Sequence, residues 1–195
     1  MSDDGRFRML PARDRHRTLW RNGGGATWEV AAGSRPDDTD FDWRISIAEV
    51  SQAGPFSDYP GVDRIITVIE GAGLDLTVDG NRQELGPRQP FRFRGEASTY
   101  GSPMGGTTKD LNVMVRRGRL TAELEMIDLG AGEALDHREP VGTSVLLVLA
   151  GQVRGTTGSG RFELLALDGV LAGRRPVELV ANGPASVAVV VLHEL

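Results

Sequence analysis

The residues whose types and spacing could carry out chemistry lie in the first half of the chain. In the segment WRISI, Arg44 and Ser46 share one face of a predicted strand, because residues two apart in a strand point the same way. The same rule places Asp110 and Asn112 on one face of the segment DLNVMV. Such a set of polar groups suits a site for a small molecule, which the protein either binds or converts by acid–base chemistry.

A third polar stretch, residues 54–64, reads GPFSDYPGVDR and combines turn residues with Ser57, Asp58, Asp63 and Arg64. Structural interpretations exist for all these residues, since Asp and Asn are common in turns and a single arginine in a strand commonly faces solvent. Their joint concentration in one half of the chain favours a functional site there.

The stretch WRNGGGATWEV, residues 20–30, places three glycines between Asn22 and a segment that carries Glu29. A glycine-rich phosphate loop would need a following Lys-Ser/Thr, or a G-x-G-x-x-G that opens a helix, and neither is present. The triplet is therefore interpreted as a bend of small residues that lets the backbone pass close to a pocket. This bend would aim Asn22 and Glu29 at a ligand.

Composition and motifs exclude several classes of function. The chain has no cysteine, which removes disulfides, thiolate metal sites and cysteine nucleophiles. Its histidines, His16, His137 and His193, are far apart in sequence, and no G-x-S-x-G motif is present, so neither a His-rich metal site nor a serine triad is predicted. A net charge of -5 and a pI of about 5.3 argue against nucleic acid as a partner. We expect no membrane span and no signal peptide, and hence a cytoplasmic protein.

Short period-two or β-branched runs with turn residues at their ends fill the chain, and they predict an all-β protein, either a sandwich or a barrel. The expected strands are 43–50, 64–71, 73–80, 91–95, 111–117, 123–129, 144–155, 161–169, 176–181 and 186–195. The residues Asp79, Gly80 and Asn81 predict a hairpin turn. No window shows an amphipathic helix.

A weak internal repeat predicts two similar halves. The segments RIITVIEGAGLDLTVDG (64–80) and SVLLVLAGQVRGTTGSG (144–160) each contain an aliphatic strand that ends at a glycine, Gly71 or Gly151. A second strand then leads to a glycine turn. Two stacked β-barrels from a duplicated unit would explain this repeat. The second copy is poorer in polar side chains and is expected to serve packing.

The motifs WRNGGGATWEV, FDWRISIAEV, GPFSDYPGVDRIITVIEG and KDLNVMVRR resemble the HutD/Ves family in order and spacing. The resemblance is strong over residues 7–120 and weak beyond. It implies a bicupin of the RmlC-like cupin superfamily, with two jelly-roll-type β-barrels. Residues 1–120 would form an N-terminal barrel with the candidate pocket, and residues 121–195 a C-terminal barrel completed by N-terminal strands.

The resemblance also implies a link to histidine utilisation and the binding of a small acid from that pathway, in a regulatory or housekeeping role. The matching positions that would face the ligand are Asn22, Glu29, Arg44, Ser46, Phe56, Ser57, Asp63, Arg64, Asp110 and Asn112. Cupins usually hold a metal through His-x-His and a Glu, whereas the approximate register here puts Pro60 and Val62 at the histidines and Arg64 at the Glu. An arginine there would attract a carboxylate instead of a cation, so no metal or other cofactor is expected.

The preferred hypothesis is a protein that binds a small molecule without a metal, in which the guanidinium groups of Arg44 and Arg64 donate hydrogen bonds to a ligand carboxylate. Phe56 and Trp20 would form an apolar wall, Asn22, Ser57 and Asn112 would orient the ligand, and Glu29, Asp63 or Asp110 would neutralise the arginines of the empty pocket. One alternative is a metal-independent isomerase or epimerase, with Glu29 or Asp63 as base and Tyr100 as acid. Another is a structural or interaction role. The apolar strands of the C-terminal half require a cover, either the first barrel or a second subunit in a homodimer.

Overall fold

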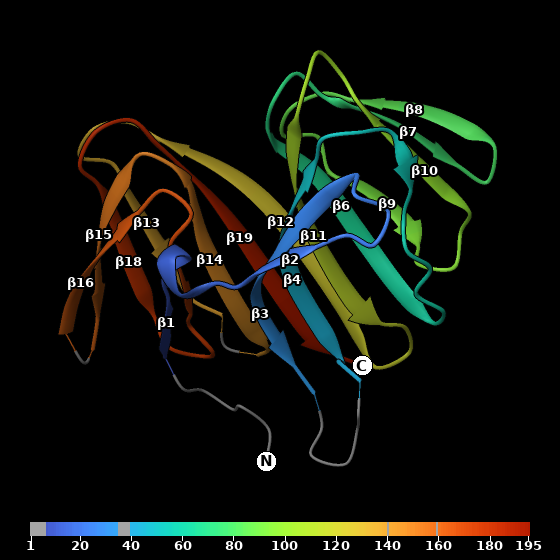
Figure 1. The fold of residues 1–195 in the computed structure, drawn as a ribbon. Helices are drawn as coiled ribbons and strands as arrows, with labels where there is room; N and C mark the ends of the chain where they lie inside the picture. The colour runs from blue at the N-terminus through green and yellow to red at the C-terminus, as the bar shows by residue number, and fades with distance from the viewer. Residues whose placement is uncertain (1–6, 35–39, 140, 159) are drawn as a thin grey trace. The chain divides into compact units, whose positions relative to one another are not determined.

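The computed structural model describes residues 7–34, 40–139, 141–158 and 160–195 (Figure 1). Regular structure in these residues is β-strand apart from one turn of 3-10 helix, η1 (Ala12–Asp14), so the all-β prediction is confirmed. No helix in the described residues is long and apolar enough to cross a membrane.

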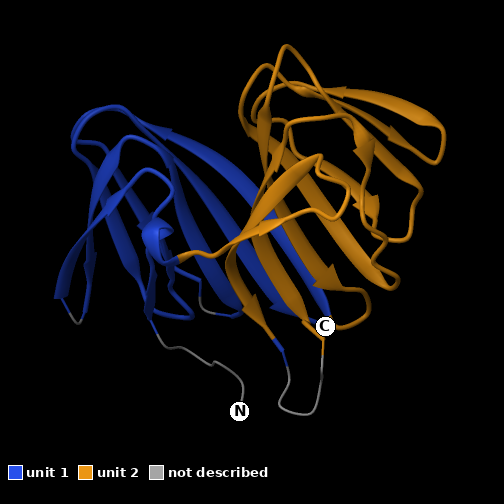
Figure 2. Cartoon of the chain, viewed as in Figure 1, with its two compact units in different colours: residues 1–14, 34–39, 120–195 blue, residues 15–33, 40–119 orange. Residues whose placement is uncertain are grey.

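The chain divides into two compact units, which are described separately (Figure 2). Unit 2 consists of residues 15–33 and 40–119, and unit 1 of the described residues of 1–14, 34–39 and 120–195.

Unit 2 contains two antiparallel sheets. The larger sheet has the order β2 (Arg17–Leu19), β3 (Gly25–Gly33), β4 (Trp43–Val50), β11 (Thr108–Arg116), β6 (Val62–Glu70) and β9 (Phe91–Arg94). The smaller sheet has the order β5 (Gly54–Pro55), β10 (Thr99–Pro103), β7 (Leu74–Val78) and β8 (Asn81–Leu85).

Unit 1 also contains two antiparallel sheets. The larger one has the order β1 (Arg8–Leu10), β17 (Gly169–Leu171), β14 (Thr143–Ala150), β19 (Ala185–Glu194) and β12 (Leu120–Leu129). The smaller one has the order β13 (Ala134–His137), β18 (Val177–Ala181), β15 (Gln152–Thr157) and β16 (Gly160–Leu165). The N-terminal strand β1 thus pairs with β17 of the C-terminal half.

The strand order of unit 2 recurs in unit 1. The sequence β4-β11-β6-β9 in one large sheet corresponds to β12-β19-β14-β17 in the other, and β5-β10-β7-β8 corresponds to β13-β18-β15-β16. Each strand number differs from its counterpart by eight. None of the four sheets closes on itself among the described residues, so hydrogen bonding defines pairs of open sheets, and the expected pair of jelly-roll-type barrels is not confirmed.

Glycines mark the strand ends of the internal repeat. β6 ends before Gly71, which has a φ of 102°, and β14 ends before Gly151, with a φ of 80°. A side chain at Gly151 would place its Cβ 2.4 Å from the carbonyl oxygen of Pro184. The run expected as one strand at 144–155 is therefore two strands, because the left-handed turn at Gly151 interrupts it.

The predicted hairpin at 79–81 is confirmed. β7 and β8 are joined by Asp79 and Gly80, which have φ values of 48° and 77°. Two consecutive positive φ angles are the pattern of a type I′ turn, whose twist matches that of the paired strands.

The core of unit 2 lies between its two sheets. Val50, Ile66 and Val68 of the large sheet pack with Leu74 and Leu76 of the small one, all at most 1% exposed. In unit 1 the corresponding space is filled by aliphatic side chains that include Leu146, Val148, Val153, Leu164 and Leu179.

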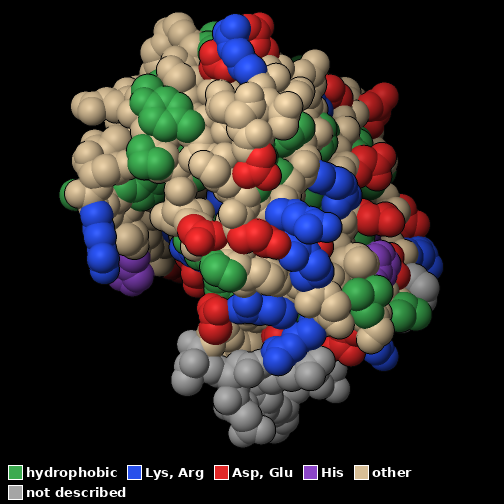
Figure 3. Space-filling model, turned by 90° about the vertical axis from the view of Figure 1, so that its right-hand side faces the viewer, with side chains coloured by type: hydrophobic (Ala, Val, Ile, Leu, Met, Phe, Trp, Pro, Cys, Tyr) green, Lys and Arg blue, Asp and Glu red, His purple; other side chains and the backbone are tan. Residues whose placement is uncertain are grey.

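Opposite charges are interspersed on the molecular surface that Figure 3 shows. Ion pairs of this kind include Arg117, whose Nε donates to Asp63 Oδ1 at 2.7 Å and whose Nη1 donates to Glu96 Oε1 at 2.6 Å. The hydrogen bonds from Arg117 lower the pKa of Glu96 to about 2.

Candidate functional site

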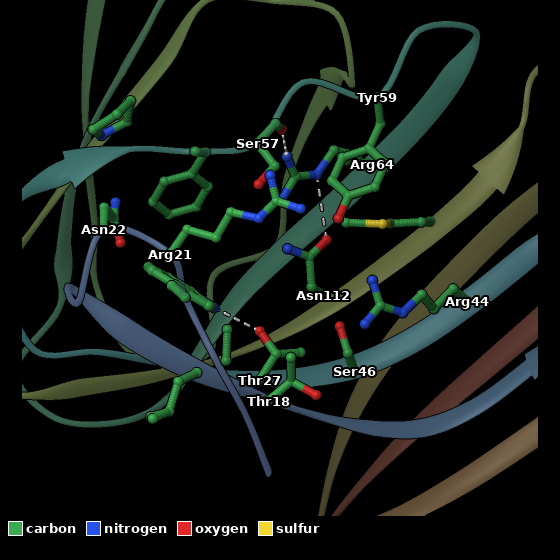
Figure 4. A pocket seen from close by; sticks show the side chains of 16 residues that line it. Thr18, Arg21, Asn22, Thr27, Arg44, Ser46, Ser57, Tyr59, Arg64 and Asn112 are labelled. Carbon is green, nitrogen blue, oxygen red and sulfur yellow. Dashed lines mark hydrogen bonds between the residues drawn. The ribbon is translucent and has the colours of Figure 1, made fainter. Parts of the chain in front are cut away.

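A pocket of about 500 Å³ opens within unit 2, on the side of the large sheet that faces the small sheet (Figure 4). It is lined by Thr18, Leu19, Trp20, Arg21, Asn22, Thr27, Arg44, Ser46, Ala48, Pro55, Phe56, Ser57, Tyr59, Arg64, Asn112 and Met114. This volume lies in the range of small-molecule sites. Three arginines and one tyrosine are the ionisable residues of the lining, and no described carboxylate belongs to it.

The floor of the pocket is built from rows of residues that pair across β4, β11 and β6. The outermost row is Arg44, Met114 and Arg64. The register then places Asn112 between Ser46 and Ile66 in a second row.

One step deeper in the sheet, Asp110 stands between Ala48 and Val68 in a third row. Of these rows, the first contributes all three residues to the lining, the second contributes Ser46 and Asn112, and the third contributes only Ala48.

Arg64 is the central cation of the pocket. It is only 4% exposed, and its guanidinium carbon lies 4.8 Å from the ring centre of Phe93, 5.5 Å from that of Tyr59 and 5.7 Å from that of Phe56. Its Nε donates to Asn112 Oδ1 at 3.5 Å and its Nη1 to the carbonyl oxygen of Ser57 at 3.3 Å. None of these groups neutralises its charge.

Burial lowers the pKa of Arg64 to about 10, against the opposing effect of the negative charge of Asp110. The side chain therefore stays a cation at neutral pH.

Two further arginines lie near Arg64. Arg44 is 22% exposed and its Nε donates to Glu29 Oε2 at 2.9 Å. Arg21 comes from the loop between β2 and β3, and in Figure 4 its side chain extends toward the guanidinium of Arg64. Three positive groups converging on one space favour an anionic occupant.

The loop with the glycine triplet forms one wall of the pocket. Gly23 has a φ of 72°, and Asn22 Oδ1 accepts a hydrogen bond from the backbone N of Gly24 at 3.0 Å. A Cβ at Gly25 would lie 2.0 Å from the carbonyl oxygen of Glu49 and 3.0 Å from the Trp20 ring. The triplet thus provides a turn and a close approach between strands, which agrees with the bend inferred from the sequence.

Aromatic side chains complete the wall. Trp20 Nε1 donates to Thr27 Oγ1 at 2.8 Å, and the Trp20 ring meets Phe56 edge-on with 6.1 Å between ring centres. Phe56 in turn lies over Gly101, where an added Cβ would be 2.4 Å from its ring. These contacts fix an apolar surface that lies beside Arg64, whose guanidinium carbon is 5.7 Å from the ring centre of Phe56.

Most positions proposed from the sequence line this pocket, namely Asn22, Arg44, Ser46, Phe56, Ser57, Arg64 and Asn112. Glu29 is not in the lining but touches it through Arg44, and its side chain is 54% exposed. Asp63 pairs with Arg117 and lies outside the lining, since it precedes Arg64 in a strand and so points to the other face.

Asp110 shares a face with Asn112, as the i, i+2 rule predicts, but it lies below the lining and is fully buried. Neither of its carboxylate oxygens has a hydrogen-bond partner among the described residues. Burial raises the pKa of Asp110 to about 7, and the positive charge of Arg64 opposes this rise.

Sequence reasoning missed several lining residues. Arg21 was overlooked although it stands beside Asn22 in the WRNGGG motif, and this adjacency is the signal that could have identified it. Tyr59 lies in the turn-rich segment that also gave Ser57 and Arg64. Thr18 and Met114 carried no distinctive signal.

A metal does not fit the residues of this pocket. Within the described ranges, no group of three or more His, Cys, Asp or Glu residues is placed to hold a metal ion. The group at the pocket centre is the guanidinium of Arg64, which would repel a cation.

Comparisons with known proteins agree with the fold and the motifs. The family model described as HutD matches residues 12–189. An uncharacterized 21.2 kDa protein from the hutC 3′ region of Pseudomonas putida is 38% identical over 123 residues, which are 63% of this chain and 65% of that protein. Protein Ves of Citrobacter koseri is 40% identical over 112 residues, which are 56% of this chain and 58% of that protein. The matched stretch therefore spans less than two thirds of these curated relatives.

Solved structures match over nearly the whole chain. A conserved protein of unknown function from Pseudomonas aeruginosa PAO1, PA5104, has a TM-score of 0.87 at 32% identity, with 96% of this chain and 99% of that chain covered. HutD from Pseudomonas fluorescens SBW25 has a TM-score of 0.81 at 27% identity, with 97% and 100% covered.

A cupin 2 conserved barrel domain protein from Leptotrichia buccalis has a TM-score of 0.58 at 10% identity, with 98% and 91% covered, and shows likeness of fold alone. The chain has a cupin-like fold, and it belongs to the HutD/Ves family.

Proposed function

We propose that this protein binds a small carboxylic acid in the pocket of unit 2, without a metal, and that it acts as a regulatory or housekeeping binder. The observation that carries the proposal is the charge of the lining, which contains Arg21, Arg44 and Arg64 and no carboxylate among the described residues. An anion is the occupant that this charge would stabilise.

Arg64 would make the strongest contact with the ligand. The guanidinium of Arg64 is buried, which costs it hydration, and no carboxylate of the described residues forms an ion pair with it. A ligand carboxylate would supply this missing partner, and each charge-assisted hydrogen bond contributes about 1.5–3 kcal/mol. Arg44 and Arg21 would bind the same group or a second polar group of the ligand.

The remaining lining residues would select the ligand. Ser46 and Asn112 lie side by side in the register and offer a hydroxyl and an amide beyond the arginines. Trp20, Phe56 and Met114 offer an apolar surface for a carbon skeleton. Small-molecule sites commonly combine an apolar surface with a few convergent polar groups in this way.

The link to histidine utilisation is part of the proposal. Its support is that one relative lies in the hutC 3′ region of Pseudomonas putida and that a similar structure is named HutD. Acids from histidine breakdown, such as imidazole-acrylate and formylated glutamate, are therefore the first ligands to test.

The test is isothermal titration of the wild type and of Arg44→Ala with these two acids, preceded by a thermal-shift screen of small carboxylic acids with and without divalent metal. Because a ligand that binds only the folded state stabilises it, a binding acid should raise the melting temperature. Arg44→Ala should weaken binding about tenfold or more. Arg82→Ala is the matched control, since Arg82 pairs with Asp75 and Glu84 on an exposed hairpin.

Binding by Arg44→Ala as tight as that of the wild type would refute the assignment of Arg44. Stabilisation that appears only with metal would refute the metal-free mode. An absence of stabilisation by every acid would favour the structural or interaction role.

The isomerase or epimerase alternative has less support from the geometry. Its named groups were Glu29 or Asp63 as base and Tyr100 as acid, and none of them lines the pocket. Tyr100 is 50% exposed on β10. Turnover of a bound acid would nevertheless establish this alternative directly.

The origin of the two units is a second part of the proposal. We infer that they derive from a duplicated unit, as in a bicupin. The recurrent strand order, offset by eight strands, supports this inference. Only the N-terminal copy would have kept a polar interior.

A further inference from the structure

The buried carboxyl group of Asp110 has no role in ligand contact, because it lies below the pocket lining. Its neighbours across the strands are Ala48 and Val68, and the pairing of β11 with β6 shifts register between Lys109 and Asp110, where β6 contains one extra residue. The side chain is fully buried and both oxygens lack a hydrogen-bond partner among the described residues. A carboxyl in such a place is costly to ionise unless a positive charge lies near it.

Arg64 supplies that positive charge. Each of the two groups acts on the other through space: the charge of Arg64 favours ionised Asp110, and the charge of Asp110 favours protonated Arg64. No hydrogen bond joins Asp110 to Arg64 among the described residues, and Arg64 donates to Asn112, the residue two positions after Asp110 on the same face of β11. Asp110 therefore acts on Arg64 through space and does not occupy its hydrogen-bond donors.

A ligand carboxylate would change this balance. The pocket side of Arg64 is open to an anion, and an anion there would take over the compensation of the guanidinium. Two negative charges would then share one buried cation, and like charges in a low-dielectric site disfavour double ionisation. Protonation of Asp110 can relieve this repulsion. The carboxyl group of Asp110 accepts no hydrogen bond among the described residues that protonation would break.

We propose that Asp110 is the internal counter-ion of Arg64 in the empty pocket and that it takes up one proton from solvent when an anionic ligand binds. Asp110 is then a positioning residue that holds Arg64 charged and in place, and it makes ligand affinity depend on pH. The inference rests on the proposed function, because it requires an anion in this pocket.

Other titratable groups near the pocket do not provide this proton site. On β4, Arg44 is paired with Glu29 of β3, and the repulsion from Arg44 acts on Arg64. On β6 the titratable group is Arg64 itself. Tyr59, in the loop before β6, interacts electrostatically with Arg64. No histidine is in the lining, so within the described lining no imidazole competes as the group that titrates near neutral pH.

The sign of the effect follows from linkage. The pKa of Asp110 is about 7 without ligand and would rise further beside a second negative charge. Binding takes up a proton in the pH range between these two values, so affinity falls as pH rises above about 7 and levels off at lower pH. With one proton fully coupled, the dissociation constant rises about tenfold per pH unit in that range.

The experiment is isothermal titration with formate, acetate, succinate and glutarate, whose carboxyl groups are ionised throughout the range from about pH 6.5 to about pH 9. The tightest of them is titrated in HEPES and in Tris at the same pH, because proton uptake makes the binding heat depend on the ionisation enthalpy of the buffer. We expect uptake of about half a proton to one proton near pH 7.5 in the wild type. In Asp110→Asn we expect no uptake and a dissociation constant that does not vary with pH.

Asp75→Asn is the control, since it removes a carboxylate of unit 2 that pairs with Arg82 on the exposed hairpin β7–β8. It should behave like the wild type. Binding heats in the wild type that do not depend on the buffer overturn the inference and leave the proposed function standing. Uptake that persists in Asp110→Asn also overturns it, since another group then takes the proton.

Infrared difference spectroscopy of the wild type keeps the inference testable if Asp110→Asn does not fold. Ligand addition should increase the absorption of a protonated, non-hydrogen-bonded carboxyl group, and an unchanged carboxyl region contradicts the inference. Absence of binding by all four acids overturns the inference together with the proposed function for this ligand class.

Discussion

The guanidinium of Arg64 lies 4.8 Å from the ring centre of Phe93, and the two residues face each other directly across β6 and β9. The rings of Tyr59 and Phe56 approach the same guanidinium at 5.5 and 5.7 Å. Aromatic faces attract a cation but leave its charge in place. These three rings therefore help to fix the position of Arg64 without using its hydrogen-bond donors, two of which donate to Asn112 and to the Ser57 carbonyl.

Replacing Arg64 with methionine should separate binding from stability. Arg64→Met should weaken carboxylate binding about 10- to 100-fold or more, because it removes charge-assisted hydrogen bonds from a buried site. At about pH 6, where Asp110 is mainly protonated because its pKa is about 7, the free energy of unfolding should stay unchanged or rise, since an apolar side chain of similar length replaces a buried charge. Titration calorimetry and thermal unfolding measure the two effects.

Arg64→Lys gives an intermediate test of the same site, because an ammonium keeps the charge and loses the planar fork. Arg82→Met is the exposed control. Wild-type affinity in Arg64→Met would contradict the central role of this arginine.

Glu29 and the ligand should compete for Arg44. The Arg44–Glu29 ion pair has an N–O distance of 2.9 Å, and the Glu29 side chain is 54% exposed. Exposed pairs contribute little to stability, about 0–1 kcal/mol, so Glu29→Gln should fold like the wild type. It should bind a carboxylate about 2- to 5-fold more tightly, because Arg44 no longer has a competing anion. Weaker binding in Glu29→Gln would instead identify Glu29 as a direct ligand contact.

Asp110 should make the free energy of unfolding depend on pH. Its pKa in the folded protein is about 7, above the usual value of 3.8, so the folded state retains a proton that the unfolded state releases between about pH 4 and about pH 7. Stability from this group is thus present at low pH and is lost as pH rises through about 7. Each pKa unit corresponds to about 1.4 kcal/mol, so the change amounts to a few kcal/mol.

Asp110→Asn removes this titration. The melting temperature of the variant relative to the wild type should therefore rise from about pH 4 to about pH 8, as measured by calorimetry at fixed ionic strength. A constant difference across this range would contradict the raised pKa. Asp75→Asn, which changes an exposed ion pair, serves as the comparison.

The three glycines of the WRNGGG motif should differ in their tolerance of alanine. At Gly25 an added Cβ would lie 2.0 Å from the Glu49 carbonyl oxygen, whereas at Gly23 nothing lies within 4 Å. Gly23→Ala should cost about 1 kcal/mol, because its φ of 72° disfavours a side chain. Gly25→Ala should cost clearly more and should weaken ligand binding, since β3 must move away from β4. Equal losses of stability in the two variants, measured by urea unfolding, would refute this difference.

The strand pattern could be predicted from the sequence because each strand carries its own signal. Period-two alternation identified β4 as residues 43–50, and the pair Asp79-Gly80 identified the β7–β8 hairpin. Short strands such as β5 (Gly54–Pro55), at a sheet edge, and β17 (Gly169–Leu171), between β1 and β14, were not predicted, because two or three residues show no period.

The candidate site was predictable only in part. Alternation tells which face a residue occupies, but not how deep in the sheet it lies, and Asp110 and Asn112 therefore looked equivalent. The same alternation argues against placing Asp63 and Arg64 in one pocket, since adjacent residues of a strand point to opposite faces. Arg21 lies in a loop, where no periodicity indicates its direction.

The fluorescence of Trp20 can report on ligand binding, because Trp20 lines the pocket. Its indole Nε1 donates a hydrogen bond to Thr27 Oγ1 at 2.8 Å, and its ring contacts the ring of Phe56. Trp20 also precedes Arg21 directly in the chain. Trp28 and Trp43 are outside the lining, so a change of intrinsic fluorescence on ligand addition should come mainly from one residue. With Trp28→Phe and Trp43→Phe replacements, the unlabelled protein would serve as a single-tryptophan sensor for the proposed carboxylic acid ligand.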